Sequence, residues 1–196
     1  DMALLRLLVM FSFVTASIAF ASSQDPSPLT PSPLFSSDPT AALIQRERAK
    51  FPEPTLINGK VPPNTPTASV GTYGFEEYYE PTKTTFTQGY AQRKAGQRTP
   101  IHMHPDPQFS CVRQGKVLSQ VEGRHDDHYY EPGGCYLMPS NTKMAAICVS
   151  PDGEDCIIED IFRIPDGSTS WVVLEPSMYY LQDQFPKDHA WQPRRQ

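Results

Sequence analysis

Proline limits what this chain can fold into. Twenty-one of its 196 residues are proline, about twice the usual share of roughly 5%. Proline removes a backbone N–H group and breaks helix interiors, so long helices cannot dominate the fold. Residues 22–66 contain ten of the prolines, with serine and threonine between them. This composition predicts an extended arm over residues 22–70.

One short helix is expected within the arm. Asp38 suits an N-cap, Pro39 suits the first helical turn, and an apolar face begins at residues 41–44. The helix should end near Lys50, because Phe51 precedes another proline.

From about Gly71 the pattern changes to short β-prone segments separated by turns rich in glycine and proline. The expected strands are 84–93, 100–104, 109–113, 116–122, 135–139, 143–150, 156–163 and 170–174. Short strands at this spacing predict an all-β domain over residues 71–180, a small sandwich or barrel with room for one small ligand. Residues 181–196 are expected to form a polar tail.

The first residues resemble a targeting segment. Arg6 precedes an apolar run over residues 7–20, which is followed by Ala21 in a small-x-small pattern. These features are typical of a signal peptide, here residues 1–21. The run is shorter than the ~20 residues that a membrane span needs. The sequence therefore predicts a secreted or periplasmic protein that leaves the membrane after cleavage. A buried helix or an uncleaved anchor is the alternative.

Charge excludes one class of partner. The chain has 17 basic and 22 acidic residues, a formal net charge of −5. This balance argues against nonspecific nucleic-acid binding, which needs a basic face, so no nucleic-acid partner is expected.

The four cysteines suit an exported protein. Cys148 and Cys156 lie symmetrically about Asp152, where a turn is expected. A hairpin with that turn would place them opposite each other, so the sequence predicts a Cys148–Cys156 disulfide. Free thiols, or pairing with Cys111 or Cys135, are the alternatives. Without a Cys-x-x-Cys motif, a zinc ribbon or a thioredoxin-like dithiol is not expected.

His102 and His104 are the strongest chemical signal. They occupy positions i and i+2 of an expected strand, so both imidazoles project from one face. Two neutral imidazoles can bind a late first-row divalent metal ion. Gln108 is placed to supply a third ligand or a supporting hydrogen bond. The alternative is that these histidines only pack or lie at the surface, as is expected for His125 and His128 in a turn-rich loop.

The spacing around these histidines resembles the first motif of the cupin superfamily. That motif is a glycine, five residues, His-x-His, three or four residues, glutamate, six residues and a glycine. Its positions are held here by Gly96, His102, His104, Gln108 and Gly115. Gln108 stands where the family usually has glutamate.

The second cupin motif is only half kept. Gly133 and Pro139 fit it, whereas Asn141, Met144 and Cys148 stand at its glycine, histidine and asparagine places. The resemblance covers residues 71–175. It implies a cupin-type double-stranded β-helix (a small jelly-roll barrel) with one transition-metal ion inside its mouth, and a homodimer, because cupins are commonly dimers.

The resemblance also implies a ligand set of His102, His104, Gln108 and Met144. An amide in place of the carboxylate removes negative charge, which disfavours hard ions such as Mn²⁺. Imidazoles with a thioether favour copper, and iron or nickel are further candidates. Met144 suits an apolar gap-filling role equally well.

Alternation along the expected strands also predicts residues that line a cavity. They are Tyr90, Arg98, Phe109, Tyr136, Met138 and Trp171. Arg98 would be able to bind an anionic substrate through two hydrogen bonds. A surface arginine in a turn is the alternative.

Two functions fit these observations. The first is a metal-dependent oxidoreductase of cupin type, dioxygenase-like or copper-type, acting on a small organic or sugar-like substrate. The second is a non-catalytic module that binds a small molecule or sugar. The intact first motif favours the enzyme, whereas Gln108 and Met144 favour the binding module or an unusual metal.

Overall fold

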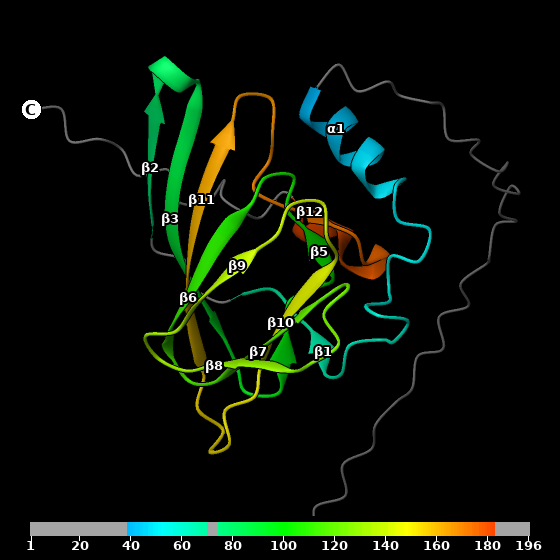
Figure 1. Cartoon of the computed structure of the whole chain (residues 1–196), viewed down its shortest axis with the longest axis vertical. Coiled ribbons are helices and arrows are strands. Elements are labelled where there is room, and N and C mark those ends of the chain that lie inside the picture. The colour runs from blue at the N-terminus through cyan, green and yellow to red at the C-terminus, as the bar shows by residue number, and fades with distance from the viewer. Residues whose placement is uncertain (1–38, 70–73, 183–196) are drawn as a thin grey trace, which may run out of the picture. The chain divides into compact units, whose positions relative to one another are not determined.

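The computed structural model of the chain describes residues 39–69 and 74–182. The regular secondary structure of the described residues consists mainly of two β-sheets, with little helix (Figure 1). The all-β fold class predicted from the sequence is confirmed. The expected signal peptide, residues 1–21, lies outside the described residues, as does most of the expected tail. No helix among the described residues is long and apolar enough to cross a membrane.

The strands form two sheets, one of seven strands and one of five. The larger sheet contains β1 (Thr65–Pro66), β4 (Gln97–Arg98), β5 (His102–Met103), β7 (Val117–Val121), β8 (His128–Tyr130), β10 (Met144–Cys148) and β12 (Val172–Val173). The smaller sheet has the order β2 (Gly74–Tyr79), β3 (Thr84–Arg93), β11 (Cys156–Pro165), β6 (Gln108–Gln114) and β9 (Cys135–Met138). The helical elements are α1 (Pro39–Arg48), η1 (Glu80–Thr82) and η2 (Pro176–Leu181).

Each strand expected from the sequence is present, and β3 has the expected bounds. Strands β1, β2, β4 and β8 were not expected. Three of them span only two or three residues, too few for a periodic pattern to show. In β2 every residue is exposed, so its sequence has no apolar alternation to detect.

The expected helix is confirmed as α1, and it covers the outer face of the larger sheet. Its Ile44 belongs to a buried cluster with Ile57, Met103 and Val172. Its Arg48 donates a hydrogen bond from Nε to the carbonyl of β12 at 2.9 Å. Part of the expected proline-rich arm therefore packs on the sheet that carries the histidine motif.

The main core fills the space between the two sheets. Its members alternate with outward-facing residues along each strand, as the pleat of a β-strand requires. The larger sheet supplies Val117, Val121, Met144, Ala146 and Cys148. The smaller sheet supplies Val112, Tyr136, Met138, Cys156, Ile158 and Phe162.

Pro100 divides the segment beside β10 into two short strands. Arg98 of β4 pairs with Ile147, and His102 of β5 pairs with Met144. Between them the Thr99 hydroxyl accepts a hydrogen bond from the Ala146 N–H at 2.9 Å. Proline has no N–H to continue the ladder, so pairing is interrupted and resumes at His102.

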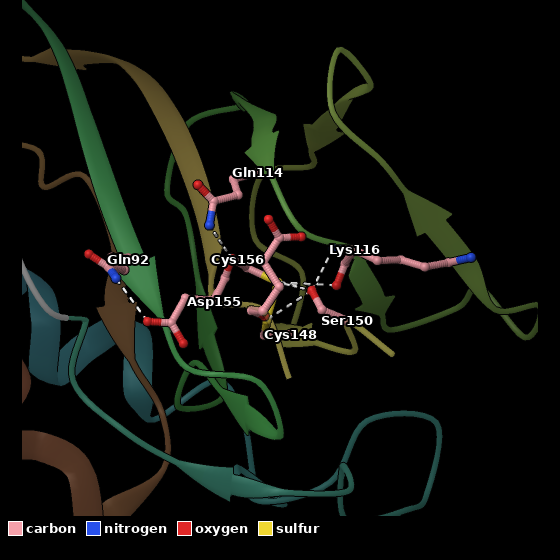
Figure 2. Close-up of a disulfide and its surroundings, with 8 residues drawn as sticks. Gln92, Gln114, Lys116, Cys148, Ser150, Asp155 and Cys156 are labelled. Carbon is pink, nitrogen blue, oxygen red and sulfur yellow. Dashed lines mark hydrogen bonds between the residues drawn. A yellow bond between two sulfur atoms is a disulfide. The ribbon is translucent and has the colours of Figure 1, made fainter. Parts of the chain in front are cut away.

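The Cys148–Cys156 disulfide is present, but its surroundings differ from the prediction (Figure 2). A hairpin within one sheet was expected. Instead Cys148 ends β10 in the larger sheet and Cys156 begins β11 in the smaller one. The turn about Asp152 carries the chain from one sheet to the other, and the disulfide joins the two sheets at that crossing.

The second disulfide, Cys111–Cys135, lies within one sheet. The two residues are register partners on β6 and β9, with their Cα atoms 4.0 Å apart. All four cysteines are therefore oxidised. Two disulfides are compatible with an oxidising compartment such as a periplasm or the cell exterior.

Gly115 lies where the chain passes from β6 to β7, next to the inter-sheet disulfide. Its φ is +76°, a region that side chains disfavour. A Cβ atom at this position would lie 2.6 Å from the Ser150 hydroxyl oxygen and 2.9 Å from the Cys156 sulfur. Both the turn and the close approach of the two sheets therefore require glycine.

Replacing Gly115 should be costly for this reason. We expect Gly115→Ala to lower the free energy of unfolding by roughly 2–4 kcal/mol, from backbone strain and overpacking together. Gly123→Ala is the matched control, because Gly123 also has a positive φ (+83°) but no atom within 4 Å of its added Cβ. Chemical denaturation of both variants measures the difference, and equal losses would contradict the packing argument.

Candidate functional site

His102 and His104 face the interior between the sheets. His102 pairs in register with Met144 of the core, while Met103 points to the opposite face under α1. The two imidazole rings are perpendicular, with centroids 5.0 Å apart. The His104 ring stacks on Phe162 of the opposite sheet, with centroids 5.6 Å apart. The predicted shared orientation of the two histidines is therefore present.

Backbone carbonyls determine which nitrogen of each ring carries the proton. His102 Nδ1 lies 2.9 Å from the Pro100 carbonyl oxygen, and His104 Nδ1 lies 2.6 Å from that of Ser170. A carbonyl only accepts hydrogen bonds, so in each neutral ring Nδ1 is the donor and Nε2 keeps its lone pair. The His104 Nε2 atom is buried and has no hydrogen-bond partner.

Burial keeps both rings neutral. His102 is 5% exposed and His104 is 2% exposed. Removal from water, together with the smaller effect of the neighbouring His104, lowers the pKa of His102 to about 3. Burial also lowers the pKa of His104 to about 4, against the opposing effect of its bond to Ser170. Neutral imidazoles with fixed Nδ1 protons are the form that binds a metal ion.

The other two expected ligands are placed differently. Gln108 is buried, but its amide bonds to the backbone of β11: Oε1 accepts from the Arg163 N–H at 2.8 Å and Nε2 donates to the Arg163 carbonyl at 3.4 Å. Met144 is 3% exposed and belongs to the core. Its register with His102 places both side chains on one face of the sheet.

The two imidazoles fit a transition-metal ion, whereas a full set of conventional ligands is not present. Within residues 39–69 and 74–182, no group of three histidine, cysteine, aspartate or glutamate side chains is able to hold a metal. Any further ligand has to be an amide, a thioether, water or a bound molecule.

The residues predicted to bind substrate are not brought together. Arg98 is 2% exposed and forms an ion pair with Glu175, with nitrogen–oxygen distances of 2.8 and 3.0 Å. Its register with Ile147 places it on the opposite face from the histidines. The expectation that Arg98 binds an anionic substrate is therefore corrected, because its guanidinium already holds a carboxylate.

Three of the four aromatic candidates also lie on different faces of their sheet. Phe109 is 53% exposed and faces outward, because its neighbours Gln108 and Ser110 are the buried residues of β6. Tyr90 lies on the same outer face and donates from its hydroxyl to Glu159 at 3.0 Å. The expectation that Phe109 and Tyr90 line a cavity between the sheets is therefore wrong. Tyr136 faces the interior and belongs to the core, as expected.

Two interior groups were not found from the sequence. The Ser170 carbonyl, which fixes His104, has no sequence signature because any residue supplies a carbonyl. Asp160 alternates with Ile158 and Phe162 along β11 and so shares their interior face. The apolar alternation through residues 156–162 was a usable signal for it. His125 is exposed as expected, whereas His128 begins β8 and is only partly exposed.

The sequence of this chain matches no protein-family model and no curated protein. Its structure is similar to a cupin 2 domain-containing protein from Halorhodospira halophila, at 14% identity over 46% of this chain and 63% of that one, with a TM-score of 0.36. A Schizosaccharomyces pombe cupin domain matches at 17% identity over 51% of this chain and 65% of that one, with a TM-score of 0.38.

A variant of Bacillus subtilis oxalate decarboxylase matches at 17% identity over 58% of this chain and 30% of that one, with a TM-score of 0.44. The chain thus spans less than two thirds of the length of each of these three proteins.

Acid should destabilise the metal-free protein through the two buried histidines. Their folded pKa values, about 3 and about 4, lie below the value of 6.5 expected in the unfolded chain. Their contribution to stability is therefore complete above pH 6.5 and is lost as the pH falls toward 4. We expect a loss of about 2 kcal/mol per histidine between pH 7 and pH 5. Chemical denaturation of the parent and of His102→Gln/His104→Gln at both pH values isolates the contribution of the two histidines to the free energy of unfolding. The same pH dependence in both proteins would contradict the assignment.

Gln108→Glu tests whether the amide supports β11 or binds a metal. The carboxylate would keep the bond from the Arg163 N–H but lose the donor to the Arg163 carbonyl. We expect the free energy of unfolding to fall by about 1–3 kcal/mol, with an unchanged order of metal affinities in competition binding. A shift toward manganese at unchanged stability would instead identify Gln108 as a ligand.

Proposed function

We propose that this chain is a cupin-type protein that binds one transition-metal ion through Nε2 of His102 and Nε2 of His104. One observation carries the proposal: His104 Nε2 is a buried nitrogen with a lone pair and no partner. A buried polar atom without a partner destabilises a fold, so such an atom points to a bound ion or to another functional role. His102 also carries its proton on Nδ1, which leaves the lone pair of its Nε2 available. The ring centroids of His102 and His104 lie 5.0 Å apart, which supports an ion bound by both rings.

The chain prepares the two nitrogens for that role. The Pro100 and Ser170 carbonyls hold the rings by Nδ1, so neither ring needs to rotate or lose a proton to bind a metal ion. Phe162 packs on one imidazole and Trp171 on the other, which limits the access of bulk water. A bound ion would supply Lewis-acid or electron-transfer chemistry at its open positions.

Copper, iron or nickel suits this site better than manganese. Nitrogen ligands without a carboxylate disfavour hard cations, and the nearby Met144 thioether is a soft donor suited to copper. The finer function that we propose is a metal-dependent oxidoreductase acting on a small organic or sugar-like molecule. We further propose export to a periplasm or the cell exterior, for which the two disulfides are the supporting structural observation, and assembly as a homodimer.

A second candidate is a non-catalytic module that binds a small molecule or sugar. It is favoured by the commitment of the Gln108 amide to the backbone of β11. It is also favoured by the lack, within the described residues, of a third conventional metal ligand.

Metal analysis separates the two candidates. The purified protein, reconstituted with each ion and passed through a desalting column, should hold one equivalent of copper, iron or nickel. His102→Ala/His104→Ala should hold none while keeping its circular dichroism spectrum. His125→Ala/His128→Ala is the matched control, because it also removes two histidines and should keep the full metal content.

Equal metal content in the two double variants would refute the site. A parent protein that binds none of these ions would favour the binding module.

A further inference from the structure

The segment that consists of β12 and the two residues before it supplies three of the contacts that hold the two imidazoles. The Ser170 carbonyl lies 2.6 Å from Nδ1 of His104. The Trp171 ring packs on the His102 ring at a centroid distance of 5.3 Å. Val173 pairs in register with His102. The placement of this one segment therefore determines which nitrogen of His104 carries the proton.

The segment lies at the edge of the larger sheet. β12 stands at the end of the strand order and pairs with β5 on its inner side. The Trp171 carbonyl and both backbone groups of Val173 form hydrogen bonds on the other side, away from β5. Val173 is 0% exposed, so its backbone groups are out of reach of bulk water. Such groups need partners from the protein itself.

Two side chains from outside the sheet take the place of a neighbouring strand. Gln182 directly follows η2. It accepts a hydrogen bond from the Val173 N–H at 2.8 Å and donates one to the Trp171 carbonyl at 2.8 Å. Arg48 of α1 donates from Nε to the Val173 carbonyl at 2.9 Å. One amide and one guanidinium thus satisfy all three backbone groups.

The two side chains also hold each other. Arg48 Nη2 donates to Gln182 Oε1 at 3.4 Å. The same guanidinium lies 3.6 Å from the centroid of the Tyr179 ring on η2, a cation–π contact. Gln182 is itself buried. The helix of the proline-rich arm and the chain after β12 are therefore joined at the edge of the segment that holds the imidazoles.

We infer that Arg48 and Gln182 are positioning residues for the proposed metal site, and that the arm helix α1 is part of the support of that site. They act through the segment whose edge they hold, because this segment presents the Ser170 carbonyl to His104. Partners that orient a metal-binding histidine fix its tautomer and increase its affinity for the ion. The inference rests on the proposed function and gives the proline-rich arm a role in it.

Asn58 provides a comparison for a role limited to stability. It also belongs to the arm, and its amide also bonds to backbone groups of the sheet. Nδ2 donates to two carbonyls at the turn after β7, and Oδ1 accepts from the Gly123 N–H. The carbonyls bonded to the imidazoles are those of Pro100 and Ser170, in other parts of the chain. Loss of the Asn58 amide should therefore reduce stability and leave the imidazoles unchanged.

Nitrogen-15 NMR of the metal-free protein is the first test, because protonated and unprotonated ring nitrogens have well-separated chemical shifts. In the parent, Nδ1 of His104 should carry the proton. Gln182→Met removes both amide bonds at similar volume, and should move part of the His104 population to the tautomer with the proton on Nε2. Asn58→Gly is the matched control: glycine tolerates the φ of +52° at this position, and the variant should keep the parent spectrum.

Nickel binding to the same proteins is the second test. Isothermal titration calorimetry with Ni²⁺ should show at least tenfold weaker binding for Gln182→Met and for Arg48→Met, and parent affinity for Asn58→Gly. Arg48→Lys keeps a cation over Tyr179 and a donor for the Val173 carbonyl, so it should retain most of the affinity that Arg48→Met loses.

Parent tautomers in Gln182→Met, or the same nickel affinity in Gln182→Met and Asn58→Gly, would overturn the inference. If Gln182→Met does not fold, Gln182→Glu replaces it, because it keeps the acceptor for the Val173 N–H and loses only the donor to the Trp171 carbonyl. Parent tautomers in that variant would count in the same way. A parent protein that binds no metal ion would refute the proposed function, whereas the tautomers of the metal-free protein test the positioning role separately.

Discussion

The covalent link between the two sheets is the constraint on which the rest of the structure depends. Cys148 ends the strand that sets the register of His102 through Met144. Cys156 begins the strand that carries Asp160 and Phe162. The disulfide therefore joins the two strands that supply opposite walls of the interior. Gly115 allows the close approach at this point, since a side chain there would collide with Ser150 and with the disulfide itself.

Desolvation determines the charge state of the buried groups on both faces of the larger sheet. The two imidazoles respond to burial by staying neutral, and a carbonyl satisfies one nitrogen of each. Arg98 and Glu175 are buried as an ion pair with two nitrogen–oxygen contacts, so their charges compensate each other on the outer side of the larger sheet.

Sequence reasoning recovered the parts of the fold that depend on local pattern. Alternation found β3 with its observed bounds, and the Asp38-Pro39 signal found α1. The spacing of His102 and His104 correctly predicted a shared face. Sequence reasoning could not show how the chain passes between the two sheets. A turn such as residues 151–153 is compatible both with a hairpin within one sheet and with a crossing from one sheet to the other. For the same reason the Cys148–Cys156 pair was found but assigned to the wrong geometry.

The errors at the candidate site came from tertiary partners that leave no local signal. Arg98 looked available because Glu175, its partner, is 77 residues away. Phe109 was assigned inward, yet buried Gln108 and Ser110 on either side of it show that the alternation of β6 has the opposite phase.

Met144 determines how many strong donors the protein offers to the proposed ion. It stands at the place where the cupin motif has a histidine, and its side chain lies on the same face as His102. A thioether there adds no charge and no strong donor, so two nitrogens would hold an ion with most of its coordination positions open. An ion held so sparsely needs a further donor, and water is restricted by Phe162 and Trp171. The further donor would then come from a bound molecule, so binding of the ion and binding of that molecule should each strengthen the other.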